Sequence, residues 1–158
     1  MEQQPAHERS IIDKIAAWIP GYGGYLGRAD RRAADKLLRD AVAERLRAVR
    51  SGIDSAIKDA TDNANLLAIG KLERARQKLD RLADRIRAAG SGNDSFWKGS
   101  GDDAKADPLH AFDLQLYQRA DTLAQNASGP HFAETLDAEL DQLEQTLDAR
   151  ARLLQGLR

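Results

Sequence analysis

Residues 72–89 of this chain read LERARQKLDRLADRIRAA, and their pattern decides the fold class. The apolar side chains of this stretch recur at alternating spacings of three and four: Leu72, Ala75, Leu79, Leu82, Ile86 and Ala89. Such a spacing places them on one face of an α-helix and is typical of the seam along which helices pack in coiled coils. The pattern predicts a helix over about residues 66–89, with Gly90 as its C-terminal stop.

Similar apolar stripes on either side of this segment predict further helices. A long helix is expected from about 29 to 59 or beyond, with a kink at Gly52, and a turn follows over residues 61–65. Asp107 as N-cap and Pro108 as first helical residue predict the start of a helix that ends before Ser128. A last helix is expected over about 131–155, and a short one over 10–19. The predicted core of the three long helices is Ala34, Leu38, Val42, Leu46, Val49, Ile53, Ile57, Ala60, Leu109, Phe112, Leu116, Ala120, Leu123, Phe132, Leu136, Leu140, Leu143, Leu147, Ala151 and Leu154.

These elements predict an all-α fold: an antiparallel bundle of about four main helices, with a short N-terminal helix and a Gly/Tyr loop at one end. Residues 1–158 form a single domain by length, with residues 1–9 flexible and residues 91–107 a long loop between helices. We expect Phe96 or Trp97 to dock on the bundle from that loop. The alternative is an elongated coiled-coil hairpin that completes its core by dimerising.

The charges are balanced overall but divided along the chain. The formal net charge is -1, yet residues 1–90 hold 18 Lys/Arg against 13 Asp/Glu, and residues 91–158 hold 6 against 12. We expect the two halves to face each other across the bundle or across a dimer; the alternative is a basic surface for an anionic partner. Overall balance and interleaved acids argue against a nucleic-acid binder.

The most unusual segment is a glycine-rich loop before the first long helix, Ile19-Pro20-Gly21-Tyr22-Gly23-Gly24-Tyr25-Leu26-Gly27. It lacks the spacing of phosphate-binding loops, and no strand leads into it. It is either a tight turn with packed tyrosine rings or a docking surface, because Tyr and Arg are frequent at interface hot spots. The candidate interaction residues are Trp18, Pro20, Tyr22, Tyr25, Arg28, Arg31 and Arg32.

Several segments together support a resemblance. The IPGYxGY loop leads into an Arg-rich helix, and the run 79–87, the pair Phe96-Trp97 and the segment 112–114 follow in order. This arrangement resembles a group of small uncharacterised bacterial helical proteins that open with the same loop. The resemblance implies a bacterial origin and an all-helical fold, and it brings no catalytic residues.

No residue set predicts catalysis, a cofactor or a metal site. The chain has no cysteine. His110 with Asp113, and His131 with Glu134, are pairs at helical spacing, whereas a metal site needs three or four converging ligands. No serine lies in a nucleophile-elbow motif. A pocket beneath the Phe96-Trp97 loop is the least favoured reading.

The predicted function is therefore that of a non-enzymatic scaffold, adaptor or assembly subunit that binds an unidentified protein, with homo-oligomerisation left open. The alternative is a peripheral membrane protein in which residues 10–19, with Ile11, Ile15 and Trp18, and the basic helix bind anionic lipid. The expected location is the cytoplasm, with the surface of the inner membrane as the alternative.

The loop hypothesis predicts that the double substitution Tyr22→Ala/Tyr25→Ala abolishes capture of a partner from the native bacterium while the protein stays folded, because the two rings form the docking surface. Affinity pull-down read by mass spectrometry measures this, with wild type alongside. Retention of every partner by the variant would assign the loop a structural role.

Overall fold

The computed structural model describes residues 31–89 and 103–156, and these two ranges contain helices and turns but no strand. Four helices form the structure: α2 (Arg31–Asp62), α3 (Leu66–Ala88), α5 (Asp103–Asn126) and α6 (Phe132–Gly156). The predicted helical bundle is confirmed. The expected helix over 10–19, the Gly/Tyr loop, the flexible residues 1–9 and the Gly90 stop lie outside the described residues.

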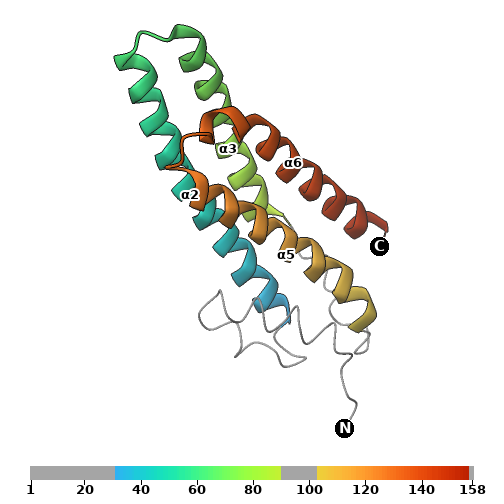
Figure 1. Ribbon diagram of the computed structural model, residues 1–158. Helices are drawn as coiled ribbons and strands as arrows, with labels where there is room; N and C mark the ends of the chain where they lie inside the picture. The colour runs from blue at the N-terminus through green and yellow to red at the C-terminus, as the bar shows by residue number, and fades with distance from the viewer. Residues whose placement is uncertain (1–30, 90–102, 157–158) are drawn as a thin grey trace.

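The four helices form two antiparallel hairpins, α2/α3 and α5/α6, that lie side by side (Figure 1). Helix α2 contacts α3 and α5, and α6 contacts α5 and α3. Ion pairs at increasing positions on both helices, Lys78–Glu144 and Arg85–Asp148, show that α3 and α6 run parallel. The neighbouring helices are thus antiparallel within each hairpin and parallel between the hairpins.

The core confirms the predicted apolar stripes. Within α3, the seam is buried from Leu72 to Ile86, and Ala89 is half-buried. Of the other predicted core positions, Phe112, Ile57, Ala151 and Leu154 are half-buried, and the side chains of Ala34 and Leu109 lie outside the described set. The remaining predicted positions are buried: Leu38, Val42, Leu46, Val49, Ile53, Ala60, Leu116, Ala120, Leu123, Phe132, Leu136, Leu140, Leu143 and Leu147. Each large aliphatic side chain contributes about 1.5–3 kcal/mol on burial. All four helices supply this core, so the α3 seam is buried within one chain.

Ion pairs between the hairpins confirm that the basic and acidic halves of the chain face each other across the bundle. Arg45 of α2 lies 3.3 Å from Asp121 of α5, and Arg85 of α3 lies 2.6 Å from Asp148 of α6. Lys78 binds both Asp141 and Glu144 of α6. Opposite charges therefore meet where the α5/α6 hairpin packs against the α2/α3 hairpin.

Gly52 allows the close approach of the α5–α6 turn to α2. Helix α2 continues through Gly52 as one element, and a Cβ added there would lie 2.6 Å from the Ala127 Cβ and 2.8 Å from its carbonyl oxygen. The sequence interpretation of Gly52 as a kink missed this role. Its absent side chain makes room for the neighbouring backbone.

Helix α5 begins earlier than predicted. Its first residue is Asp103, so the loop expected over residues 91–107 loses its last five residues to the helix, and Pro108 is not the first helical residue. The segment Ala104-Lys105-Ala106 has high helix propensity, and this outweighs the start signal at Asp107-Pro108. Pro108 lacks the N–H that would bond to the Ala104 carbonyl, and it lies little more than one turn from the helix start.

A glycine exchange tests the contact at Gly52. We expect Gly52→Ala to lower the free energy of unfolding by about 1–3 kcal/mol, because the new methyl group overlaps a backbone carbonyl that cannot rotate away. Gly70→Ala on α3 is the matched control: its Cβ would meet only the Arg74 guanidinium at 3.7 Å. That variant should gain up to ~1 kcal/mol from helix propensity. Denaturant unfolding measures both, and equal effects of the two changes would contradict the close approach.

Candidate functional site

Most of the predicted interaction residues lie outside the described part of the chain: Trp18, Pro20, Tyr22, Tyr25 and Arg28. Arg31 and Arg32 are the first two residues of α2, and their side chains are not among the described ones. The docking role of the Gly/Tyr loop stays a prediction. Candidate sites in the rest of the chain come from buried polar groups, a cavity and the end of the α2/α3 hairpin.

Asp113 and Arg150 form an ion pair inside the bundle. The Arg150 Nε donates to the Asp113 Oδ1 at 2.6 Å, and both residues are 1% exposed. Sequence analysis considered Asp113 only beside His110 as a metal ligand and overlooked Arg150. Asp113 and Arg150 lie at helical spacing from the apolar residues of α5 and α6, so they fall on the buried faces of these helices. This spacing in the sequence could have predicted that both are buried. The pair joins α5 to α6 by a charged hydrogen bond that solvent does not reach.

Two arginines of α2 form hydrogen bonds with its neighbouring helices α3 and α5. Arg39 donates to the backbone carbonyl oxygens of Arg87, at 3.1 Å, and of Ala89, at the C-terminal end of α3. Its positive charge also matches the partial negative charge of that helix end. Arg45 donates to the Tyr117 hydroxyl at 3.3 Å, and its guanidinium carbon lies 5.9 Å from the centre of the Tyr117 ring. The hydrogen bond that Arg45 donates to Tyr117 is the main cause of its raised pKa, and the charge of Asp121 also raises it.

A cavity of about 230 Å³ lies between the last turn of α3 and α6. Its lining is mostly small or aliphatic: Ala88, Ala89, Leu147, Ala151 and Leu154, with Arg85 and Arg150 beside them. Both arginines are engaged by the carboxylates of Asp148 and Asp113. The described lining is therefore mostly apolar, and both of its arginines are paired with carboxylates.

The described residues hold no group of three or more His, Cys, Asp or Glu side chains that could bind a metal ion. His131 lies 3.3 Å from Glu134, and both are exposed. Within the same ranges, none of the helices has the length and apolar character needed to cross a membrane.

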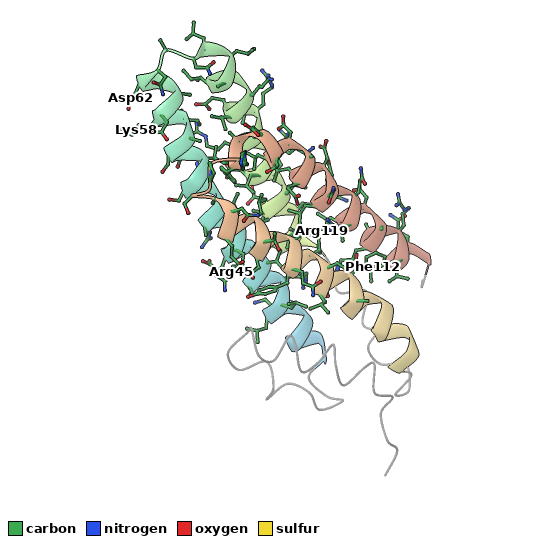
Figure 2. The ribbon with its side chains drawn as sticks, in the orientation of Figure 1. Arg45, Lys58, Asp62, Phe112 and Arg119 are labelled. Atoms are coloured by element: carbon green, nitrogen blue, oxygen red, sulfur yellow. The ribbon has the colours of Figure 1, made fainter. Side chains whose placement is uncertain are left out.

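The turn end of the α2/α3 hairpin extends beyond the α5/α6 hairpin (Figure 1). The close approach of Ala127 to Gly52 marks the level on α2 just after the end of α5. Ile53 and Leu72, beyond this level, are still buried. We call the part of the hairpin beyond this level, residues 53–74, the hairpin tip. Figure 2 shows Lys58 and Asp62 near the end of the tip, away from α5 and α6.

The turn of the hairpin tip is fixed by its own hydrogen bonds. The Asn65 N–H donates to the Ala60 carbonyl at 2.8 Å and the Ala64 N–H to the Thr61 carbonyl at 3.0 Å. Ala64 has φ 52, so this is the Schellman arrangement with alanine where glycine is common. The Asn65 side chain then accepts from the Ala68 N–H at 3.2 Å and caps α3. The first residues of α3 are thus held in a defined position.

Two leucines at this position are the exposed large hydrophobic residues of the described chain. Leu66 is 80% exposed and Leu67 is 72% exposed. Ala56, Ile57, Ala68 and Ile69 beside them are half-buried and pack on the end of the core. An apolar group presented on a rigid turn is a feature of protein-binding surfaces.

The charges of the hairpin tip are partly paired. Arg76, just beyond the tip, binds Asp54 at 3.0 Å and Glu73 at 2.7 Å, and the hydrogen bond with Asp54 is the main cause of its raised pKa. Lys58 binds Asp62 at 3.3 Å. These are acids and bases on the exposed surfaces of α2 and α3.

A scan against protein-family models, a search of curated proteins and a search of solved structures found no match to this chain.

Removing one partner of the buried pair tests its structural role. We expect Arg150→Met to lower the free energy of unfolding by about 3–5 kcal/mol, because the Asp113 carboxylate then loses its buried counter-charge. The double variant Asp113→Leu/Arg150→Met should lose less than Arg150→Met alone. Arg152→Met, an exposed neighbour on α6, is the control and should stay within about 0.5 kcal/mol of wild type. Equal stabilities of the two single variants in denaturant unfolding would exclude this role.

Proposed function

We propose that the protein is a non-enzymatic helical scaffold or adaptor that binds a protein partner through the hairpin tip, residues 53–74. The observation that carries the proposal is the exposure of Leu66 and Leu67 on a turn held by its own hydrogen bonds. Burying two such side chains against a partner contributes several kcal/mol, at about 1.5–3 kcal/mol each. The rigid turn lowers the entropic cost of binding.

The length of α2 supports an adaptor in particular. Its 32 residues span about 48 Å at 1.5 Å per residue. Arg31 and Arg32, which belong to the predicted Gly/Tyr docking segment, begin this helix, and the tip lies at its other end. A bundle with a docking segment at each end of one helix can hold two partners apart at a fixed distance.

The described surface of α2 gives less support to the membrane alternative. Its exposed bases are interleaved with acids, as in the pairs Lys36–Asp40 and Arg47–Glu44. Such pairing leaves no continuous basic stripe for anionic lipid. The protein-binding proposal is therefore the one that the described residues favour.

We expect Leu66→Gln/Leu67→Gln to reduce capture of the native partner at least tenfold in an affinity pull-down, because the polar amides remove the apolar contact. Both positions are exposed, so the free energy of unfolding should stay within about 0.5 kcal/mol of wild type. Ala133→Gln/Ala138→Gln, at exposed positions of α6, is the matched control and should retain the partner.

Full retention of every partner by Leu66→Gln/Leu67→Gln would overturn the role of the hairpin tip. If anionic vesicles, and no protein, then bind the wild type in a flotation assay, the membrane alternative replaces the proposal.

A further inference from the structure

The cavity between α3 and α6 lies at the end of the bundle opposite the hairpin tip, and its lining follows α6 for two turns. Leu147, Arg150, Ala151 and Leu154 line it from α6. Positions three, four and seven apart lie along one side of a helix, and seven residues span about 10 Å. Ala88 and Ala89 of α3 lie on the other side of the cavity. The lining therefore has the length of a short helix.

The cavity is open to solvent and has room for large apolar side chains. Ala88 is exposed, and Ala89, Ala151 and Leu154 are half-buried. An apolar cavity of about 150 Å³ takes up benzene in other proteins, and this one measures about 230 Å³. Alanines in its lining let another helix approach closely. The mostly apolar lining therefore favours an apolar helix face as occupant.

The N-terminal segment of the chain joins the bundle at this same end. Arg39 of α2 donates to the carbonyl oxygen of Ala89, which lines the cavity. Helix α2 begins at Arg31, eight residues earlier, so its start lies about 12 Å beyond the level of Ala89. Neighbouring helix axes are about 8–10 Å apart, which places the cavity roughly 20 Å from Arg31.

Residues 10–19, which the sequence predicts as a short helix, match the cavity in length and chemistry. Ile11, Ile15 and Trp18 follow one another at spacings of four and three, so in a helix they share one side over about 10 Å.

The segment that connects residues 10–19 to α2 is long enough for this contact. Residues 20–30 contain four glycines. A flexible chain of this length has an end-to-end distance of roughly 18 Å and extends to about 40 Å. Residues 10–19 therefore reach the cavity without strain in the connection.

We propose that the cavity between α3 and α6 is the docking site of the chain's own residues 10–19, with Ile11, Ile15 and Trp18 along the two-turn strip of α6. This contact withholds the apolar side of the segment from lipid. It also attaches the Gly/Tyr loop to the bundle at both of its ends. The inference concerns the end opposite the hairpin tip and does not depend on the proposed function.

Two other occupants fit the cavity less well. Phe96 and Trp97 are adjacent in the sequence, with Cα atoms about 3.8 Å apart, so they match a strip of about 10 Å less well than three residues spaced over two helical turns. Residues 10–19 of a second copy have the same side chains, but the tethered segment of the same chain competes at an effective concentration of about 1 mM or more.

Cross-linking of the full-length protein tests the contact, because the chain has no native cysteine. We expect Ala16→Cys/Ala88→Cys to form an intramolecular cross-link with a short bis-maleimide at a rate at least about tenfold above that of Ala16→Cys/Ala138→Cys, because docking raises the effective concentration. Ala138 is the matched control: like Ala88 it is an exposed alanine, and it lies on α6 about 20 Å from Ala151.

Tryptophan fluorescence measures the same contact without a reagent. In Trp97→Phe the emission comes from Trp18 alone, since the chain has two tryptophans. Adding Ala88→Glu places a charge in the cavity and should shift this emission to longer wavelength, because the ring moves into water. Ala138→Glu, the same exchange at an exposed position far from the cavity, should leave the emission unchanged.

The other results overturn the docking of residues 10–19. Equal cross-linking rates of the two cysteine pairs, or a Trp18 emission that Ala88→Glu leaves unchanged, would show that the segment does not occupy the cavity. A cross-linked product of twice the mass would assign the cavity to a second copy. A shift of the Trp97 emission by Ala88→Glu in the Trp18→Phe background, without one for Trp18, would assign it to Phe96 and Trp97.

Discussion

The contact between Gly52 and Ala127 is the constraint on which the arrangement of the two hairpins depends. A side chain at Gly52 would collide with the methyl group and carbonyl of Ala127, so only glycine lets the α5–α6 turn rest on α2 at this level. The contact determines how far along α2 the second hairpin reaches. The core is built from all four helices, and the turn end of the α2/α3 hairpin extends beyond it (Figure 1).

Charge then selects how the hairpins face each other. Arg45 meets Asp121 between the parallel helices α2 and α5, and Lys78 and Arg85 meet the acids of α6 between the parallel helices α3 and α6. Exposed pairs of this kind contribute about 0–1 kcal/mol each, so they select among packings more than they stabilise the fold. The buried pair of Asp113 and Arg150 favours one register of α5 on α6, because a shifted register would leave one charge alone in the core.

The hairpin tip follows from both features. The seam of α3 is still buried at Leu72, whereas Leu66 and Leu67 at the turn are exposed. The turn is held by backbone bonds and by the Asn65 cap, so Leu66 and Leu67 stay presented to solvent. The proposed partner would bind these two apolar side chains.

The sequence by itself determined the helices and their buried faces, because the spacing of Leu72 to Ile86 and of Phe132 to Leu147 depends only on the period of the α-helix. It also indicated that the basic and acidic halves pair with each other. Local signals were misleading where tertiary packing acts: Gly52 looked like a kink, and Asp107-Pro108 looked like a helix start. Only the tertiary structure decided that α3 runs parallel to α6, that Asp113 binds Arg150, and that the α2/α3 hairpin extends beyond its neighbours. These features depend on which helices meet and at what level, and the period of a single helix contains no information about that.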